Sequence, residues 1–241
     1  MTQFSELHAI STPLQDALGR LGFPSMTPVQ AGTLPQALEG RDIMAQGQTG
    51  SGKTVAFAVA TLNRVEVTEF TTQVVVLCPT RELAAQVAEQ YRAVGQCMSN
   101  LKVLTLCGGE PMGPQIQSLK HGAHVIVGTP GRILDHLQKN RIDLSGVTSR
   151  VLDEADRMLD MGFADDVDEI FSYTAEQVQT LLFSATWTDG IKRMANKYLA
   201  DPLTFTAKAD VVANPDIEQQ AYSVEEHTRL IALKAVLTTI Q

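Results

Sequence analysis

The sequence predicts an α/β fold with a mostly parallel sheet and helices on both of its faces. Short apolar runs rich in β-branched residues alternate with helical patterns along the chain. A glycine-rich loop joins the first of these runs to a helix, and acidic residues follow a later run. Continuous apolar strands alternating with helices are typical of parallel sheets that are buried on both faces. Ligands of such sheets bind at the carboxyl ends of the strands, so the residues after each strand are the candidate functional residues.

The predicted elements follow the order of these runs. We expect strands at residues 42–45, 74–78, 103–106, 125–127, 150–152, 180–183 and 203–205. We expect helices at residues 53–62, 86–94, 133–138, 166–171 and 191–199, where apolar residues recur with helical spacing. Residues 1–207 are therefore predicted to form one domain.

The pattern changes after residue 207. Residues 208–216 are polar and small, which predicts a linker. Residues 217–222 predict a strand, and residues 228–240 predict a helix with Leu230, Leu233, Leu237 and Ile240 on one face. We expect residues 217–241 to be the truncated start of a second domain.

Composition narrows the class of protein. The 241 residues are 44% hydrophobic and 19% charged, which suits a globular domain with a large core. No run of ~18 apolar residues and no secretory signal pattern occurs, so we expect no membrane segment. Cys78, Cys97 and Cys107 form no Cys-x-x-Cys pair, which favours reduced thiols in a cytoplasmic protein. The net charge of −8 argues against a general nucleic-acid coat but leaves room for a local phosphate-binding groove.

Residues 47–54, GQTGSGKT, fit the phosphate-loop pattern Gly-x-x-x-x-Gly-Lys-Ser/Thr. In this pattern the loop amides cradle phosphates, the lysine reaches the β/γ oxygens and the hydroxyl binds Mg²⁺. The flanking strand and helix favour this interpretation over a chance glycine-rich turn, because a helix N-terminus attracts anions. The predicted nucleotide-binding residues are Gln48, Thr49, Gly50, Ser51, Gly52, Lys53 and Thr54.

Asp153 and Glu154 follow the predicted strand at residues 150–152. A nucleotide hydrolase must hold Mg²⁺ and align a water. We predict that Asp153 holds Mg²⁺ through water, since this ion keeps much of its hydration, and that Glu154 activates the attacking water. The alternative is a solvated strand end or a helix cap.

Residues 151–156 have the sequence VLDEAD. With GQTGSGKT, PTREL, GG, TPGR and SAT in that order, the chain resembles the first RecA-like domain of the DEAD-box RNA helicases over residues 4–207. The resemblance implies a RecA-like P-loop NTPase domain that binds ATP and Mg²⁺, contacts RNA and couples hydrolysis to duplex opening. Lys53, Asp153 and Glu154 are its implied catalytic residues.

The resemblance also implies an adenine site. Gln30 has an amide that suits the N6/N7 edge of adenine, because it both donates and accepts. Phe23 is implied to stack on the base, and Phe4 is the candidate for an isolated upstream aromatic. Without the resemblance, both phenylalanines would be interpreted as core residues.

The implied RNA contacts follow three other strands. They are Pro79, Thr80, Arg81, Gly108, Gly109, Thr129, Pro130, Gly131 and Arg132. Contacts of this kind to phosphate and sugar carry no sequence information, so we expect sequence-independent binding with RNA preferred through its 2′-hydroxyls. For Arg132 a phosphate contact and an internal ion pair remain equal alternatives.

Ser184, Ala185 and Thr186 resemble the element that couples hydrolysis to strand separation. By the same resemblance, Asp156 is expected to hydrogen-bond the Ser184 and Thr186 hydroxyls. The alternative is a plain strand-to-helix cap, for which Ser and Thr are suitable residues.

The runs LTLCGG, GRILDHLQKNRIDL and LLFSATW are similar to a DbpA-like subfamily of bacterial members that act on large-subunit ribosomal RNA. This suggests a role in ribosome biogenesis. His121 and His124 have the spacing of helix-borne metal ligands, but no third ligand stands near, so we interpret them as a surface and loop pair.

Two other functions are considered. One is a nucleotide-binding module with little catalysis, because the family's arginine fingers lie on the second domain, and such a finger is worth ~10³–10⁵ in turnover. We expect slow hydrolysis by this chain alone, and a monomer. The other is a DNA-directed or nucleic-acid-independent ATPase, against which Gln30 and the PTREL and TPGR segments argue.

Overall fold

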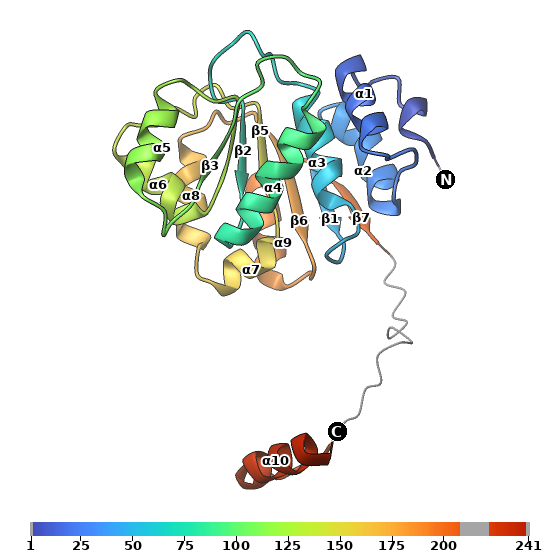
Figure 1. Cartoon of the computed structure of the whole chain (residues 1–241), viewed down its shortest axis with the longest axis vertical. Coiled ribbons are helices and arrows are strands. Elements are labelled where there is room, and N and C mark those ends of the chain that lie inside the picture. The colour runs from blue at the N-terminus through green and yellow to red at the C-terminus, as the bar shows by residue number, and fades with distance from the viewer. Residues whose placement is uncertain (1, 208–221, 240–241) are drawn as a thin grey trace. The chain divides into compact units, whose positions relative to one another are not determined.

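The computed structural model describes residues 2–207 and 222–239. The chain divides into two compact units, Met1–Ala207 and Lys208–Gln241, and each is described by itself. The first unit is a layered α/β body (Figure 1). The predicted linker and most of the predicted strand at 217–222 lie outside the described residues, so the domain assignment stays a prediction.

The strands of the first unit match the expected runs to within a residue or two. They are β1 (Ile43–Gln46), β2 (Val74–Leu77), β3 (Val103–Leu106), β4 (Val125–Gly128), β5 (Ser149–Leu152), β6 (Gln179–Ser184) and β7 (Leu203–Thr206). They form one seven-stranded sheet in the order β3-β4-β2-β5-β6-β1-β7, and every pairing is parallel. The predicted fold class is confirmed.

The helices alternate with these strands. They are α1 (Thr12–Arg20), α2 (Pro28–Leu38), α3 (Lys53–Leu62), α4 (Arg81–Val94), α5 (Met112–Leu119), α6 (Pro130–Gln138), α7 (Ala155–Asp160), α8 (Ala164–Ser172) and α9 (Asp189–Tyr198), with a short 3-10 helix η1 (Phe4–Glu6). The sequence pattern did not predict α1, α2, α5 or α7. Pro35 lies inside α2, and Gly113 and Pro114 lie in α5, residues that usually weaken a helix.

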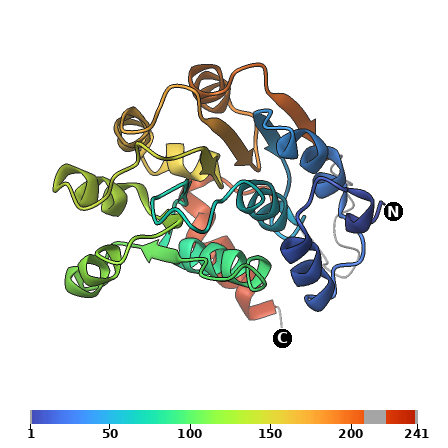
Figure 2. The same cartoon turned by 90° about the horizontal axis from the view of Figure 1, so that it is seen from above.

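Two cores cover the two faces of the sheet. One packs α1 to α4 against β-strand residues such as Val74 and Phe183, and the other packs α6 to α9 against residues such as Val75 and Leu182. Alternate residues of β2 and β6 thus point to opposite cores, as the strand period requires. Figures 1 and 2 show helices on both sides of the twisted sheet.

The strand order decides which loops meet. β1 pairs with β6, so Gln46 lies opposite Ser184, and β2 pairs with β5, so Leu77 lies opposite Leu152. Because all strands are parallel, the segments after β1, β5 and β6 emerge at one edge of the sheet. The motifs at residues 47–54, 153–156 and 184–186 are therefore neighbours.

The second unit contains a 3-10 helix η2 (Glu226–Thr228) and α10 (Arg229–Thr239), close to the predicted helix. Its large apolar residues Leu230, Ile231, Leu233 and Leu237 are exposed within the described part of the chain. In the ranges that the structure describes, no helix is long and apolar enough to cross a membrane.

Candidate functional site

The loop between β1 and α3 has the backbone that the phosphate-loop motif requires. Gly50 and Gly52 have φ angles of 82° and 92°, in the left-handed region that favours glycine. Gly52 is the N-cap of α3, so the first free amides of that helix lie next to the loop. The loop and the helix terminus together form an anion-binding concavity.

Lys53 is held by this loop. Its Nζ donates to the carbonyl of Gly47 at 2.6 Å and to that of Gln48 at 3.0 Å, and the side chain is buried. Ser51 Oγ also donates to the Gln48 carbonyl, at 2.8 Å. The loop therefore holds the ammonium group in place, and a phosphate oxygen could replace one of the two carbonyl oxygens that accept its hydrogen bonds.

Gln30, from α2, contacts the same loop. Its Nε2 donates to the Gly52 carbonyl at 3.1 Å, and its Oε1 accepts from the Thr27 amide at 2.9 Å. Gln30 is 5% exposed, and within the described residues one of its two amide hydrogens and one of its two carbonyl lone pairs have no partner. The structure thus brings the predicted adenine-reading residue beside the phosphate loop.

The two phenylalanines differ. Phe23 is 38% exposed. Phe4 is 4% exposed and belongs to the core that packs α1 to α4. A buried ring has no free face, so the placement of Phe4 supports the core interpretation and not base stacking.

A pocket of about 390 Å³ lies between the loop and the end of β5. Lys53 and Thr54 line one side of it, and Asp153 and Glu154 line another. Side chains of α4, including Gln86, complete the wall. The predicted phosphate-binding and acidic residues therefore face one cavity, although they lie about a hundred residues apart in sequence.

Asp153 is 2% exposed, and its Oδ1 accepts from the amide of Glu154 at 3.0 Å. Burial raises the pKa of Asp153 to about 6; the nearby Lys53 ammonium opposes the shift and the Glu154 carboxylate adds to it. A buried carboxylate with only one intramolecular hydrogen bond is a strong candidate to bind a cation.

Glu154 joins β5 to α7 in a left-handed conformation, with φ 52°. Non-glycine residues rarely adopt this conformation, and such residues gather at functional sites. Its carboxylate is 2.8 Å from Arg157 Nη1, and its side chain is 17% exposed. The predicted base is thus partly sheltered and ion-paired at the pocket rim.

Asp156 makes only one of the two hydroxyl hydrogen bonds that were predicted for it. Asp156 Oδ2 accepts from the Thr186 hydroxyl at 2.9 Å and from the Thr186 amide at 3.1 Å. Ser184 Oγ instead donates to the Thr186 carbonyl at 2.8 Å. The expectation that Asp156 bonds both hydroxyls is therefore wrong for Ser184, because that hydroxyl closes its own turn.

Backbone contacts connect this coupling segment to the phosphate loop. The Gly47 amide donates to the Ser184 carbonyl at 3.2 Å, and Gln46 Nε2 donates to the Ala185 carbonyl at 2.9 Å. Movement of the loop would therefore displace the segment that carries Thr186. Sequence analysis missed Gln46, since a single glutamine at a strand end carries no motif.

The predicted RNA residues follow β2, β3 and β4. Thr80 caps α4 by accepting from the Leu83 amide at 3.3 Å, and Pro130 begins α6. Gly109 has φ 77°, and a Cβ there would lie 2.3 Å from Arg81 Nη1, so the guanidinium packs directly over this glycine. These segments form one surface at the same edge of the sheet.

Arg132 makes internal contacts. Its Nη1 donates to the Glu110 carbonyl and to Gln115 Oε1, both at 3.1 Å, and its Nη2 donates to the Glu110 carbonyl at 3.2 Å. These are hydrogen bonds to neutral oxygens, so neither alternative from the sequence, a phosphate contact or an internal ion pair, describes them.

His124 is not on the surface, which corrects the interpretation of the histidine pair. Its ring is fully buried, and Nδ1 accepts from the Lys102 amide at 2.9 Å. Burial lowers its pKa. His124 therefore satisfies a backbone donor ahead of β3, whereas His121 is exposed.

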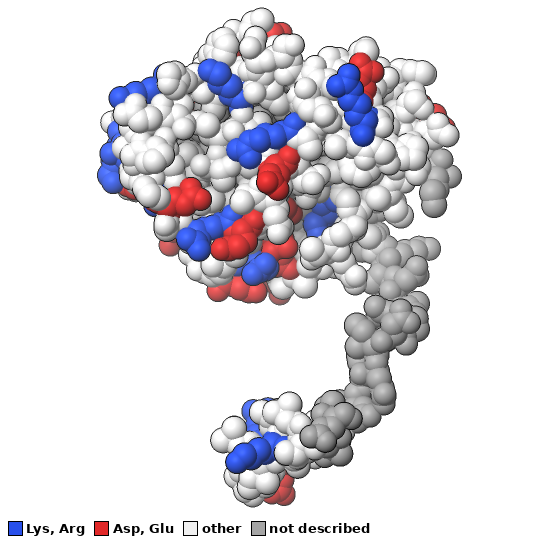
Figure 3. All heavy atoms as spheres, viewed as in Figure 1, with Lys and Arg blue, Asp and Glu red and all other residues white. Residues whose placement is uncertain are grey.

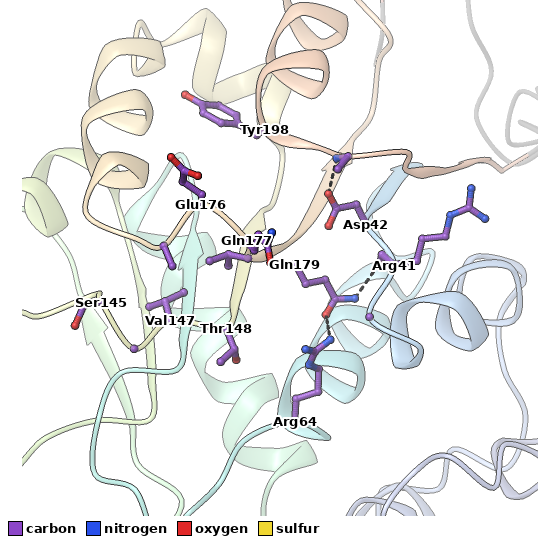
Figure 4. A pocket seen from close by; sticks show the side chains of 15 residues that line it. Arg41, Asp42, Arg64, Ser145, Val147, Thr148, Glu176, Gln177, Gln179 and Tyr198 are labelled. Atoms are coloured by element: carbon purple, nitrogen blue, oxygen red, sulfur yellow. Dashed lines mark hydrogen bonds between the residues drawn. The ribbon is translucent and has the colours of Figure 1, made fainter.

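A larger pocket, of about 740 Å³, lies at the opposite, amino edge of the sheet (Figure 4). The Asp42 carboxylate in its lining accepts from the Thr180 and Ala200 amides, each at 2.7 Å, whereas the buried Tyr198 hydroxyl has no partner among the described residues. Gln179 Nε2 donates to the Ala37 and Arg41 carbonyls at 2.7 and 2.9 Å. None of the predicted site residues lines it, so its size alone does not make it the functional site.

Charge is mixed on the surface. On the face in Figure 3, basic and acidic side chains are interspersed and do not gather by sign. This agrees with the net charge of −8 and leaves recognition of a polyanion to a few placed groups and to backbone amides.

Comparison with known proteins agrees with this arrangement. Residues 27–194 match the model of the family described as DEAD/DEAH box helicase. The chain is 46% identical to the ATP-dependent RNA helicase DbpA of Escherichia coli, over all 241 residues and 52% of that protein. It is 43% identical to the DEAD-box ATP-dependent RNA helicase CshA of Bacillus cereus, over 98% of the chain and 45% of that protein.

The crystal structure of a DEAD box protein from Methanococcus jannaschii superimposes with a TM-score of 0.81 at 38% identity. The match covers 98% of this chain and 63% of that one. The chain thus spans about half the length of the curated relatives it matches.

Proposed function

The chain belongs to the DEAD/DEAH box helicase family, and on this premise we propose that it is the ATP-binding core domain of an ATP-dependent RNA helicase. The observation that carries the proposal is the buried Asp153, which faces the same pocket as Lys53 and Thr54. Since the chain spans about half of its curated relatives, the activity of the whole protein is part of the proposal.

The residues fit ATP with Mg²⁺. Loop amides from Gln48 to Gly52 and the Lys53 ammonium would hold the phosphates, and Gln30 with Phe23 would hold the adenine. Thr54 and Asp153 would hold the metal, with water between, and their hard oxygen donors suit it. Bound there, Mg²⁺ would neutralise charge on the β- and γ-phosphates.

Glu154 is proposed to accept the proton of the attacking water. It lies next to Asp153 and lines the same pocket, and the left-handed backbone re-aims its side chain from the strand direction. Its ion pair with Arg157 must open or rotate for this role. A placed base of this kind contributes ~10²–10⁴ in rate.

RNA binding is proposed for the surface formed by Pro79–Arg81, Gly108–Gly109 and Thr129–Gly131. Backbone amides at the start of α6 and the Arg81 guanidinium would contact phosphates without reading bases. The bonds from Asp156 to Thr186, and from Gln46 to Ala185, support coupling between hydrolysis and RNA. The resemblance of the runs LTLCGG, GRILDHLQKNRIDL and LLFSATW to the DbpA-like subfamily favours ribosomal RNA as the target and a role in ribosome biogenesis.

A second candidate is a nucleotide-binding module with little turnover of its own. It is favoured by the pairing of Glu154 with Arg157, which occupies the carboxylate proposed as the base. We therefore expect this chain alone to be a cytoplasmic monomer that binds ADP or ATP weakly and hydrolyses ATP slowly until a second RecA-like domain supplies arginines.

The test compares Glu154→Gln with Lys53→Ala in the full-length protein. Glu154→Gln should keep ATP binding within about twofold and reduce RNA-stimulated turnover ~10²–10⁴-fold, because it removes only the base. Lys53→Ala should lose binding as well as turnover. Equal loss of binding in both variants would refute the assignment of Glu154, and stimulation by DNA equal to that by RNA would refute the RNA proposal.

A further inference from the structure

A buried polar cluster lies beneath the proposed RNA surface. At its centre is Gln115, in α5, which is 6% exposed. Its Oε1 accepts from Arg132 Nη1 and lies 3.1 Å from His136 Nε2. Its Nε2 donates to the Cys107 carbonyl at 3.1 Å and to Glu110 Oε2 at 3.4 Å. The amide thus connects β3, the turn after it, α5 and α6.

The chemistry of the partners settles the orientation of this amide. Arg132 is a donor only, so it must meet the oxygen of Gln115, and the Cys107 carbonyl is an acceptor only, so it must meet the nitrogen. With Oε1 accepting, His136 can bond only as a donor from Nε2. The network therefore specifies both the amide rotamer and the histidine tautomer.

His136 is a neutral donor in the interior. The residue is fully buried, and within the described residues its Nδ1 has no hydrogen-bond partner. Burial lowers its pKa, and the nearby Arg141 and Arg132 lower it further, since a second positive charge there is unfavourable. Buried polar side chains usually have a hydrogen-bond partner, and the partner of this ring is Gln115.

The cluster fixes the turn that carries Gly108 and Gly109. Cys107 precedes the two glycines, and Glu110 follows them. Gln115 bonds both ends of the turn, and Arg132 clamps the Glu110 carbonyl from α6 with two nitrogens. The position of Gly109 in turn sets where the Arg81 guanidinium lies.

We propose that Gln115 and His136 are positioning residues for RNA binding. They touch no RNA. They hold the Gly108–Gly109 turn and Arg132 in one arrangement, and this arrangement aligns the three segments that contact phosphates. The inference rests on the proposed RNA surface. It assigns Arg132 to the framework of that surface. Shifted segments would no longer meet successive phosphates together, and affinity would fall without a change at the nucleotide pocket.

The test measures binding of a fluorescently labelled single-stranded RNA by anisotropy, in the full-length protein with saturating nucleotide. Gln115→Leu and His136→Phe resemble the original side chains in shape, are somewhat larger, and remove the hydrogen bonds. Each should raise the RNA dissociation constant about tenfold, as expected when a buried bonded group loses its partner. Nucleotide affinity should stay within about twofold of the wild type.

His136→Gln should restore RNA binding, because the glutamine amide nitrogen can donate to Gln115 Oε1 in place of the histidine Nε2. We expect its RNA affinity to lie within about threefold of the wild type. Gln117→Leu is the matched control on the exposed face of α5, and His121→Phe is the control for an exposed histidine. Both should leave RNA binding unchanged.

The outcomes separate the two proposals. Wild-type RNA affinity in folded Gln115→Leu and His136→Phe would overturn the positioning role alone. Equal losses in His136→Gln and His136→Phe would overturn the hydrogen bond as its cause. A wild-type protein that binds no RNA would overturn the proposed RNA surface and this inference together, whereas equal loss of nucleotide and RNA affinity would show a general structural role.

Discussion

The two edges of the sheet each bury an aspartate, and the two aspartates do different things. At the amino edge, both oxygens of Asp42 accept backbone amides, from Thr180 and Ala200, at 2.7 Å. At the carboxyl edge, Asp153 has one such bond, from Glu154, and its pKa is raised to about 6. The first carboxylate is satisfied by the fold, and the second is left for a ligand.

The two aspartates differ in how many hydrogen bonds the fold gives them, and the size of the neighbouring pocket does not follow that difference. The pocket beside Asp42, of about 740 Å³, is nearly twice as large as the one beside Asp153, of about 390 Å³. Buried polar groups that are bonded stabilise a fold, whereas an incompletely bonded one needs another explanation. The smaller pocket holds such a group, beside a lysine and a phosphate loop.

The largest expected effect is on stability at the amino edge. Asp42→Ala leaves the Thr180 and Ala200 amides without acceptors, which should lower the free energy of unfolding by about 2–5 kcal/mol. Urea denaturation measures it. Asp168→Ala, at a half-exposed aspartate of α8 that pairs with Lys197, is the control and should change it by under about 0.5 kcal/mol. Similar values for the two variants would contradict a structural role for Asp42.

Lys53→Ala should act on binding and not on stability. Losing charge-assisted bonds to phosphate should weaken ADP binding at least about 100-fold, equivalent to about 2.7 kcal/mol. Trp187, the single tryptophan of the chain, follows Thr186 and donates from Nε1 to Thr206 Oγ1 at 3.2 Å, so its fluorescence offers a readout of titration. Lys192→Ala, on exposed α9, is the control; unchanged ADP affinity in Lys53→Ala would exclude this loop as the phosphate site.

Asp153 should make the nucleotide-free protein less stable as pH rises. Its carboxyl binds a proton more tightly when folded, with a pKa of about 6, than when unfolded, at 3.8. Its contribution to stability is therefore lost as pH rises from about 4 to about 6. Between about pH 5 and about pH 8 the free energy of unfolding should fall by about 1–2 kcal/mol because of this group.

Asp153→Asn tests this effect, because an amide does not titrate. The variant should lack the Asp153 component of the pH dependence in denaturant melts, should be no less stable than wild type near pH 8, and should lose ATP turnover. A variant with the same pH dependence as wild type would refute the raised pKa of Asp153.

The smallest effect is expected at the pocket rim. Arg157 is 56% exposed at its side chain, so its pair with Glu154 is well screened. Arg157→Ala should change the free energy of unfolding by less than about 0.5 kcal/mol. Thermal melts can be compared with Lys192→Ala, which removes the exposed pair with Asp189. A clearly larger loss would mean that Arg157 helps to hold the strained backbone at Glu154.

Much of the fold followed from local pattern. The seven apolar runs became seven strands, because short apolar β-branched runs that alternate with helical segments are typical of the buried strands of a parallel sheet. α3 began at Lys53 as expected, since the loop determines its N-terminus. The helices α2 and α5 were missed because proline and glycine lie within them, and tertiary packing overrides their weak propensity.

The residues of the candidate site also fall into those that local pattern predicted and those that it did not. The residue types at Lys53, Asp153 and Glu154 were predicted, because the spacing within each motif is local. A core position for Phe4 and an internal role for Arg132 were each one of two open interpretations, and the bond from Thr186 alone to Asp156 was not predicted, because each depends on a neighbour from another element.

The alternation of strands and helices, the phosphate loop and the acidic pair could be predicted from the amino-acid sequence, because each depends on residues that are contiguous in the chain. Three-dimensional packing was needed to show that Asp42 accepts two backbone amides and Asp153 only one, and that Gln115 meets His136. The physical reason is that hydrogen-bond satisfaction depends on which distant segments pack together. That pairing follows from the order of strands in the sheet, which no local spacing specifies.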